Sequence, residues 1–587
     1  MSGVPPSPNQ GKLKPALPLA LLAAAIAFAA MQPVTGNGFV EWDETAYIID
    51  NPLIRHLSFK NIAAIFSSLD LSLYSPLSTL SFAFDYAIGG LNPAVYHWHN
   101  LILHCLNTGL TLLLALRLGF AVPAAFLLAA LFGAHPLHVE SVAWAAERKD
   151  VLYSFLFLIS LYSYTLYEEK RTRAHYYISL SSFILAVLAK PMAVTLPLVL
   201  LLLDWYNRRQ DRGRALLEKI PFFAVAALFA FYILSLPKDP RLTVLYSVES
   251  RAMAPLYNIG FYVVKAFWPT DLCAAYTQPD GGALGLWLYA AAGLLLLAVT
   301  AICRRNRLFV AGTLFYLITL LPVMQLFPFG PVISADRYSY MPLLGIFAVM
   351  AAGFAKIAEK EKCRVTAWAV CGAVLLSLIM TARARAEVWK DGVTLWSDTS
   401  SKQPSTMAFH ALGNSLSAIG QNSEAVESYT KALSLNPKYA KALVNRGTAL
   451  IKIKLYADGM ADYERAIRLN PGYEQTYANM ASAYYEQKNF QKAAEWIERA
   501  VYLRPDSDTL WSAAGIFFAS ANETEQAEYY FSKALQLNPN NGEAYYSLCL
   551  ISRRKHSLPE ARAYCRRAMA LGYPVSPHII ALLGAGE

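Results

Sequence analysis

The sequence predicts an all-α protein in two parts, a polytopic bundle of membrane helices followed by an α-helical solenoid. Apolar residues make up 56% of the 587 residues and charged residues only 16%, which is too apolar for a soluble protein of this size. From about residue 401 the long apolar runs stop and a repeat of 34 residues begins, as in stacked helical hairpins. The expected division is a cytoplasmic tail at 1–15, a membrane domain at 16–400, a solenoid at 401–575 and a C-terminal tail at 576–587.

The membrane domain is expected to cross the bilayer about eleven times. Lys and Arg concentrate on the cytoplasmic side of membrane proteins, and placing each basic cluster there makes the apolar runs alternate without conflict. Residues 255–268 are taken as an interfacial or re-entrant helix, because a further span there would reverse the sides of all later loops. The expected spans are 16–34, 98–118, 122–138, 151–167, 175–190, 192–206, 220–236, 285–302, 308–325, 342–355 and 365–381, and the basic clusters lie at 117, 170–173, 208–214, 304–307 and 356–364.

This topology places the N-terminus in the cytoplasm and the solenoid outside it. Lys12 and Lys14 precede the first apolar run, which therefore reads as an uncleaved signal-anchor. The cytoplasmic loops are short and basic, whereas the longer polar segments fall on the outer face. Chemistry is accordingly expected on the outer face, with the first outer loop, 32–97, as the catalytic loop.

An acidic stretch follows the first apolar run directly. Glu41, Asp43 and Glu44 lie within four residues at the mouth of a membrane helix, where charge is costly unless it is used. A carboxylate near a second carboxylate, partly removed from water, has a raised pKa and suits a general base. We expect Asp43 to be that base, with Glu44 as its neighbour; the alternative is a solvated loop acid.

Two further outer segments carry charge. His135, His138 and Glu140 precede Arg148 and Lys149, and Arg337 lies in a later segment beside Asp336. Cations left on the outer face oppose the usual charge bias and are expected to bind an anion such as a phosphate. The alternative is surface ion pairs of Arg148 with Asp150 and of Arg337 with Asp336. A His-x-x-His pair without a further acid is weak evidence for zinc, so no metal ligand is expected and a divalent ion is not supported.

The repeats are tetratricopeptide repeats. Pro437, Pro471, Pro505 and Pro539 are spaced by 34 residues, and small residues recur at three inner positions of each unit where paired helices approach closely. Five units are expected. Cys549 and Cys565 fall on the two facing helices of the fifth unit, where they form either a disulfide, if the solenoid lies outside the cytoplasm, or two packed thiols.

Taken together, these features resemble the transmembrane and tetratricopeptide-repeat family of protein O-mannosyltransferases, of the GT-C glycosyltransferase fold. The resemblance is carried by the first-loop acids, the segments His-Pro-Leu-His-Val-Glu-Ser-Val-Ala, Glu-Arg-Lys-Asp-Val-Leu and Ala-Asp-Arg-Tyr-Ser-Tyr-Met-Pro, and the repeats. It implies an inverting enzyme that moves a sugar, mannose by default, from a polyprenyl-phosphate carrier to a hydroxyl acceptor, which is expected to be a protein Ser or Thr.

The resemblance also implies residue roles. Asp43, with Glu44, matches the catalytic acids of the first loop; His138 and Glu140 match the acceptor- or substrate-binding segment; and Arg148, Lys149 and Arg337 match the cations that face the carrier phosphate. The donor is a substrate and no cofactor is implied. The repeats would engage a polypeptide acceptor or partner. The short loops and the signal-anchor suggest a bacterial inner membrane with periplasmic repeats.

Other classes of function fit parts of the sequence. A catalytically inactive scaffold would use the repeats to recruit envelope proteins, but it needs neither Asp43 nor the outer cations. A transporter of lipid-linked sugars would place ionisable residues in mid-span, whereas the acids here lie at span ends; Lys190 and Asp204, near span ends, are expected to snorkel. No aromatic-interleaved basic stripe indicates a nucleic-acid partner.

Overall fold

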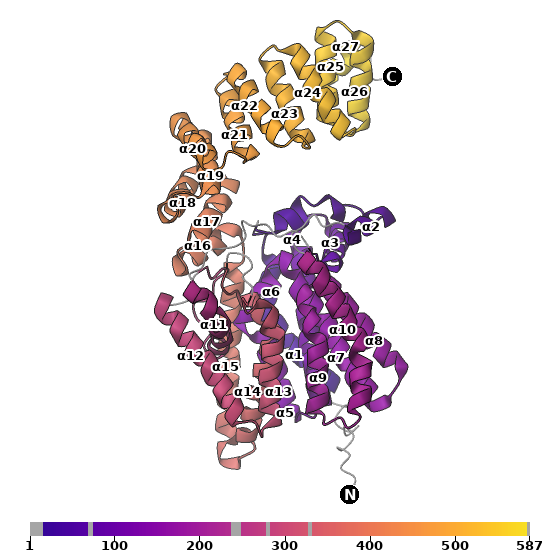
Figure 1. Ribbon diagram of the computed structural model, residues 1–587, viewed down its shortest axis with the longest axis vertical. Helices are drawn as coiled ribbons and strands as arrows, with labels where there is room; N and C mark the ends of the chain where they lie inside the picture. The colour runs from indigo at the N-terminus through magenta and orange to yellow at the C-terminus, as the bar shows by residue number, and fades with distance from the viewer. Residues whose placement is uncertain are drawn as a thin grey trace. The chain divides into compact units, whose positions relative to one another are not determined.

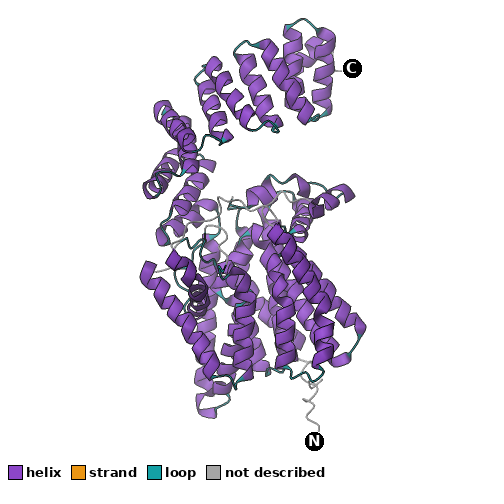
Figure 2. Ribbon diagram, viewed as in Figure 1, coloured by secondary structure: helices purple, strands orange, loops and turns teal. Residues whose placement is uncertain are grey.

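A computed structural model describes the protein as two compact, all-helical units, Met1–Pro404 and Ser405–Glu587. The described residues contain no β-strand, and only an isolated bridge pairs Tyr276 with Ser334 (Figure 2). The predicted fold class is therefore confirmed. Glu41, the tail at 1–15 and much of the outer loop at 237–254 lie outside the described residues. The structure describes residues 16–40, 42–67, 74–235, 248–277, 282–326 and 332–583.

The first unit is a bundle in which each of the eleven predicted apolar runs forms a helix (Figure 1). Its helices are α1 (Ala16–Met31), α2 (Phe59–Ser67), α3 (Pro76–Gly89), α4 (Pro93–Arg117), α5 (Val122–Ala134), α6 (Val139–Ala143), α7 (Arg148–Lys170), α8 (Arg173–Ala189), α9 (Leu196–Tyr206), α10 (Arg212–Ser235), α11 (Val248–Phe267), α12 (Gly282–Ile302), α13 (Arg307–Leu320), α14 (Leu343–Ala358), α15 (Glu361–Val388) and α16 (Gly392–Lys402). The short helical turns are η2 (Gln32–Gly36), η3 (Thr45–Ile49), η4 (Pro52–Ile54), η5 (Pro136–His138), η6 (Ala145–Glu147), η7 (Pro191–Thr195), η9 (Leu321–Val323) and η10 (Asp336–Ser339).

Fewer helices than eleven are long and apolar enough to cross a membrane by themselves. Among the described residues there are five, and a sixth results if the α5 segment and Pro136–Ala143, bent by 50°, count as one span. The others are shortened by 3-10 turns or interrupted by polar side chains, as in α7, which begins with Arg148, Lys149 and Asp150. The number of spans stays a prediction. The five helices are Ala16–Gly36, Pro93–Arg117, Arg212–Ser235, Gly282–Ile302 and Glu361–Val388.

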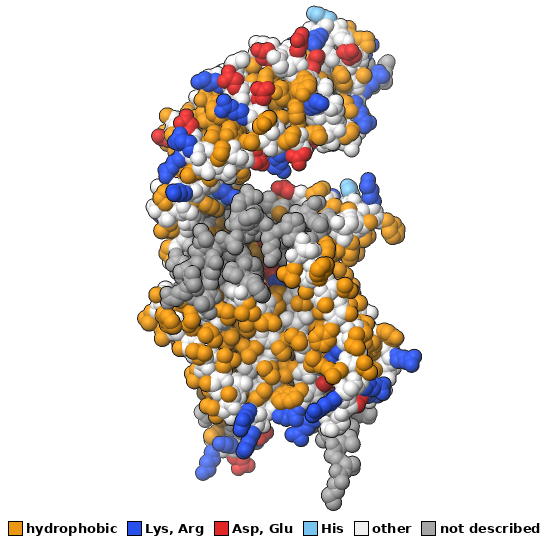
Figure 3. All heavy atoms as spheres, in the orientation of Figure 1, with side chains coloured by type: hydrophobic (Ala, Val, Ile, Leu, Met, Phe, Trp, Pro, Cys, Tyr) orange, Lys and Arg blue, Asp and Glu red, His pale blue; other side chains and the backbone are white. Residues whose placement is uncertain are grey.

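One end of the bundle is basic. The helices run up and down (Figure 1), so the basic clusters at 170–173, 208–214, 304–307 and 356–364, which join successive helices, fall at the same end. Figure 3 shows Lys and Arg gathered at this lower end and apolar side chains over the flank above it. The N-terminus of α7 lies at the other end, about 33 Å along the helix from Lys170. Such charge segregation is typical of membrane proteins.

The segment at 255–268 belongs to α11, which packs tightly along α12. Gly260 faces the backbone of Tyr289 and Gly293, and Gly293 faces the carbonyl of Leu256, so closely that a Cβ on either glycine would collide with backbone atoms. Glycine is needed at this crossing because only bare backbones can approach to such a distance. Whether α11 is re-entrant or spans the membrane stays a prediction.

The second unit consists of five helix pairs and a final short helix. Its helices are α17 (Thr406–Ala418), α18 (Asn422–Leu435), α19 (Ala440–Lys452), α20 (Tyr456–Leu469), α21 (Glu474–Glu486), α22 (Phe490–Leu503), α23 (Asp508–Ser520), α24 (Thr524–Leu537), α25 (Gly542–Arg554), α26 (Leu558–Ala570) and α27 (Pro577–Leu583). The repeat of 34 residues thus corresponds to one helix pair per unit, as predicted.

Each pair is closed by a contact between its two helices. In the first unit a Cβ on Gly413 would lie 2.5 Å from the Tyr429 ring, and Gly447 repeats this contact one unit later. The fifth unit has Cys549 and Cys565 at the equivalent positions, joined by a disulfide. The structure thus resolves the alternatives for these two cysteines in favour of the bond.

Candidate functional site

The acidic loop is anchored at the end of the bundle opposite the basic clusters. The Asn37 side chain donates to the carbonyl of Ala386 at 3.0 Å, and the Gly38 amide donates to the carbonyl of Lys390 at 2.8 Å. These bonds tie the segment after α1 to the end of α15. The loop is therefore held by a rigid helix rather than left as a free surface loop.

Asp43 begins a new helical turn. Its carbonyl accepts hydrogen bonds from the amides of Ala46 and Tyr47 at 3.1 and 3.0 Å, which open the π-helical turn η3. Within the described residues, its half-buried carboxylate has no hydrogen-bond partner. Burial raises the pKa of Asp43 and Glu147 adds to the rise, while Lys149 and Arg337 oppose it. The carboxylate is thus positioned, partly dehydrated and free to accept a proton.

Glu44 lies behind Asp43. It is buried, its Oε2 accepts a hydrogen bond from the Trp42 amide at 3.2 Å, and burial raises its pKa to about 7. Because the carboxyl is closed off from solvent, the structure favours a supporting role for Glu44 over direct contact with a substrate.

Tryptophans hold the acidic stretch against the rest of the bundle. Trp42 stacks on Trp144 with ring centroids 4.4 Å apart and meets Trp396 edge-on at 4.8 Å. Trp389 stacks on the other side of Trp144 at 6.0 Å. Aromatic pairs of this kind stabilise by about 0.5–1.5 kcal/mol each beyond their buried area. The stack fixes the residue that precedes Asp43.

Acids and cations from six separate segments meet beside Asp43. We call this set the charged cluster, and its members are Asp43, Glu140, Glu147, Lys149, Asp150, Lys190 and Arg337. Carboxylates outnumber cations by one in the cluster, so the three cations are not in excess. What matters for anion binding is how much hydrogen-bonding capacity each cation has left.

Lys149 has the most capacity left. Its residue is only 3% exposed, yet within the described part of the chain its ammonium makes no hydrogen bond. It lies 3.7 Å from Glu147 Oε2 and 4.3 Å from the centre of the Tyr47 ring. An ammonium carries three donors, and leaving them unused in a buried place is costly. Because α7 begins here without a side-chain cap, the helix dipole also favours an anion.

Arg337 is held in place by Glu140. Its backbone amide donates to Glu140 Oε2 at 2.9 Å, and its guanidinium pairs with Glu140 Oε1. The guanidinium also lies over the rings of Trp144 and Tyr338, at 5.2 and 4.9 Å from the centroids. Since both oxygens of the buried Glu140 are occupied by Arg337, the geometry favours positioning of Arg337 over acceptor contact for Glu140.

Glu147 and Lys190 complete the cluster, although the sequence analysis assigned neither of them a role in the site. Lys190 is buried and pairs with Glu147 and, at 2.7 Å, with Asp150, so it does not snorkel to the surface. Although burial opposes ionisation of Glu147, the charges of Lys190, Lys149 and Arg337 lower its pKa. The available signal was that Lys190, like Lys149, is a cation at the outer end of a predicted span.

Arg148 is not brought to Asp43. Its guanidinium pairs with the buried Asp85 on α3 at 2.6 Å, donates to the Tyr96 carbonyl at 2.8 Å and contacts Asn100. All of these partners lie on α3 and α4. The alternative of a surface pair between Arg148 and Asp150 is therefore wrong, and the position of Arg148 indicates that it holds α7 to α3 and α4 rather than binding a phosphate.

His138 lies in the bundle core. It is fully buried, its Nδ1–H donates to the Phe132 carbonyl at 2.7 Å, and its Nε2 has no partner among the described residues. Tyr340 packs on its ring with centroids 4.8 Å apart. The structure thus places His138 inside the bundle, closed to solvent and out of reach of a bulky acceptor.

The remaining expectations concern Asp336 and metal ions. Asp336 accepts a hydrogen bond from the Tyr276 hydroxyl at 3.0 Å, and Arg337 pairs with Glu140 instead, so the alternative of a surface pair between Asp336 and Arg337 is wrong. Within the described residues, no group of three or more His, Cys, Asp or Glu side chains is arranged to hold a metal ion.

Comparison with known proteins finds several that are similar in sequence to most of this chain. "Protein O-mannosyl-transferase TMTC1" of Homo sapiens is 27% identical over 516 residues, covering 76% of this chain and 58% of that protein. This chain is thus similar over most of its length to the TMTC protein O-mannosyl-transferases. TMTC4 of Homo sapiens is 24% identical over 61% of this chain, and TMTC2 of Homo sapiens is 46% identical over 92 residues. The chain spans about three fifths of the length of TMTC1.

The repeats are recognised independently of the TMTC relatives. Two family profiles described as "Tetratricopeptide repeat" match residues 410–474 and 454–515. A solved structure, "Crystal structure of YrrB: a TPR protein with an unusual peptide-binding site", is 18% identical over 32% of this chain and 96% of its own, with a TM-score of 0.28. The two family profiles confirm the predicted tetratricopeptide repeats over the residues that they match.

Proposed function

We propose that this protein is a membrane glycosyltransferase that moves a sugar, mannose by default, from a polyprenyl-phosphate carrier to a hydroxyl of a polypeptide. The observation that carries the proposal is the proximity of two groups that make no side-chain hydrogen bond within the described residues, the Asp43 carboxylate and the Lys149 ammonium. A base and an anion site side by side are what transfer from a phosphate carrier to an alcohol requires. The names of the TMTC relatives support the same class of reaction.

In the proposed reaction Asp43 accepts the proton of the acceptor hydroxyl. The acceptor oxygen then attacks the anomeric carbon, a new C–O bond forms, and the bond from that carbon to the carrier phosphate breaks. The electron pair leaves with the polyprenyl phosphate. One displacement of this kind inverts the configuration at the anomeric carbon.

The leaving phosphate would be stabilised by Lys149 and Arg337. Charge-assisted hydrogen bonds to phosphate are short and about twice as strong as neutral ones, and a buried site strengthens them further. Lys149 would supply free donors, whereas Arg337 would act through its positive field and the guanidinium face left by Glu140. Glu147 and Glu140 would keep the two cations in place between turnovers.

We further propose that the charged cluster faces the extracytoplasmic side, which is the periplasm if the membrane is a bacterial inner membrane. The basic clusters lie at the other end of the bundle, and the solenoid carries the Cys549–Cys565 disulfide, which favours an oxidising compartment. The tetratricopeptide repeats would bind the polypeptide acceptor or a partner protein. Reporter fusions at Asn422 and Asp211 would test this, with alkaline-phosphatase activity expected only at Asn422.

A transfer assay tests the activity itself. The purified full chain and the Asp43→Asn variant would be incubated with radiolabelled polyprenyl-phosphate hexoses and periplasmic extract. We expect label in protein from the wild type and a loss of about 10²–10⁴-fold in the variant, the usual contribution of a general base. Because the Asp43 carboxylate has no hydrogen-bond partner in the described part of the chain, the isosteric amide should leave folding intact, which thermal unfolding would check.

Other outcomes of this assay are informative. Label in lipid or glycan, lost with Asp43→Asn, would keep the enzyme and change the acceptor. Equal transfer by both proteins would reject Asp43 as the base. Absence of transfer by the folded wild type with every donor would favour a membrane scaffold that works through its repeats.

A further inference from the structure

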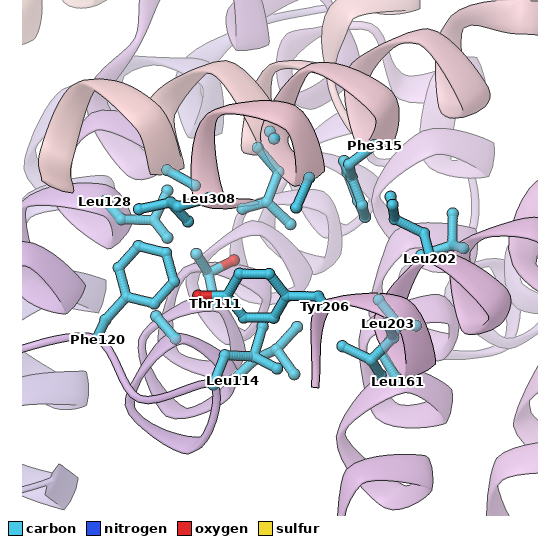
Figure 4. Close-up of a pocket in the computed structure, with 18 residues that line it drawn as sticks. Thr111, Leu114, Phe120, Leu128, Leu161, Leu202, Leu203, Tyr206, Leu308 and Phe315 are labelled. Atoms are coloured by element: carbon cyan, nitrogen blue, oxygen red, sulfur yellow. The ribbon is translucent and has the colours of Figure 1, made fainter. Parts of the chain in front are cut away.

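A second hollow lies at the basic end of the bundle, away from the charged cluster. It is a cavity of about 100 Å³ enclosed by α4, α5, α7, α9, α13 and α14 (Figure 4). Leu114, Leu203 and Leu308 line it from the last turns of α4 and α9 and the first turn of α13. The lining is almost wholly apolar, and all six helices that form it belong to predicted membrane spans. Hydrocarbon is therefore the material that would fill it most favourably.

Two polar groups at this cavity have no partner among the described residues. The Thr111 hydroxyl is buried in its wall, and Figure 4 shows Tyr206 reaching across the cavity toward it. The Arg307 Nε–H, beside the cavity but outside its lining, is buried as well and has no hydrogen-bond partner among the described residues, although a terminal nitrogen of the same guanidinium donates to the Trp205 carbonyl. Arg307 directly precedes Leu308 of the lining, and it lies over the Trp205 ring at 4.6 Å. A buried donor on a cation, left unpaired, indicates a missing acceptor.

The apolar cavity and the arginine fit the two halves of one molecule. A phospholipid has hydrocarbon chains attached to a phosphate head group, and basic pockets between membrane helices on the cytoplasmic side bind anionic head groups. Arg304 and Arg305 lie exposed in the same connection between α12 and α13, which adds positive charge near the surface. The polyprenyl carrier is a less suitable occupant, since its phosphate would be needed at the opposite end of the bundle, beside Asp43.

We propose that this cavity and Arg307 form a binding site for one anionic glycerophospholipid of the surrounding bilayer. An acyl chain occupies the cavity and a phosphate oxygen accepts the hydrogen bond of Arg307 Nε. The lipid fills a gap where six helices converge, so its binding stabilises the folded bundle. The inference does not depend on the proposed glycosyl transfer.

The site can be tested on the purified full chain by native mass spectrometry and thermal unfolding. The probes are phosphatidylglycerol and phosphatidylcholine with identical acyl chains. We expect the wild type to prefer phosphatidylglycerol by about fivefold, the effect of one cation near an anionic head group, and to gain thermal stability with it. Arg307→Gln should abolish the preference, whereas the exposed control Arg304→Gln should keep most of it.

A cavity-filling variant tests the apolar half. Ala348 and Ala311 both line the cavity, so Ala348→Phe, with Ala311→Phe as a second variant in case the first fails to fold, should weaken binding of both lipids. Equal binding of the two lipids by the wild type, insensitive to these variants, would overturn the proposal. Displacement of phosphatidylglycerol by polyprenyl phosphate, one for one and sensitive to Ala348→Phe, would also overturn it by assigning the cavity to the sugar carrier.

Discussion

The loss of the Lys149 ammonium gives the sharpest test of the charged cluster. We predict that Lys149→Met lowers kcat/KM for the lipid-linked donor by about 10- to 150-fold. The magnitude follows from the structure: the ammonium has no competing hydrogen bond, so a phosphate would gain one charged hydrogen bond, which contributes about 1.5–3 kcal/mol, and each 1.4 kcal/mol is about tenfold in rate. The effect should fall mainly on interactions with the carrier phosphate.

The same substitution should change the pH profile. Lys149 is the first of the charges that hold down the pKa of Asp43, which burial raises above its usual value of 3.8. Without that charge the pKa rises further. A base works only when ionised, so the rate falls as the pH drops through this pKa. The acidic limb of kcat/KM should therefore move to higher pH in Lys149→Met.

The assay is steady-state transfer of labelled hexose to an acceptor peptide, measured across pH with the protein in nanodiscs. Lys190→Met is the matched control, because it removes a buried ammonium that is fully paired with Glu147 and Asp150. That variant should lose about 3–5 kcal/mol of stability, whereas the free energy of unfolding of Lys149→Met should be close to that of the wild type. An unchanged kcat/KM and an unshifted acidic limb in folded Lys149→Met would refute the anion site.

Three further predictions concern stability. Arg148→Met leaves the buried Asp85 with His99 as its remaining partner and should cost up to about 3–5 kcal/mol in thermal unfolding, yet keep the donor KM of the folded fraction; a raised KM would restore Arg148 as a phosphate ligand. Burial raises the pKa of Glu44 to about 7, so the folded protein favours the protonated carboxyl. The stability that this protonated form contributes is complete below pH 4.5 and is lost as the pH rises through 7. Glu44→Gln should thus raise the free energy of unfolding at pH 8 by up to about 3 kcal/mol and change nothing at pH 4; a gain equal at both pH values would contradict this. Cys565→Ser opens the disulfide with Cys549, across a sequence separation of 16, and should cost the solenoid about 3 kcal/mol, seen as earlier proteolysis in urea; equal resistance of the variant and the wild type would contradict this.

Much of the fold is readable in the sequence because local pattern and fold agree. Long apolar runs form helices wherever they occur, since a backbone in an apolar medium must satisfy its own hydrogen bonds. The repeat of 34 residues predicts the helix pairs because each pair must bury the same inner face against its neighbour. The number of spans cannot be read in the same way, because length and hydropathy do not distinguish a short span from a re-entrant helix, the two possibilities for α11.

The candidate site is only partly readable. The acidic stretch and the outer cations stand out as charges that a membrane protein would otherwise avoid. Arg148 and Lys149 look equivalent in the sequence, but successive residues of a helix point about 100° apart. One therefore faces Asp85 on α3, and the other faces Asp43. No sequence pattern could have told which of the two is free.

The sequence by itself thus determined the two-part architecture, the basic and acidic ends of the bundle, and Asp43 as the candidate base. Tertiary structure decided which charged side chains pair with one another and which remain available to bind a substrate. Glu140 and Arg337 are separated by 197 positions, and Lys190 reaches Glu147 from the far end of α8. Such pairs form because a buried charge must find a partner, and only the folded packing of the helices determines which partner is within reach.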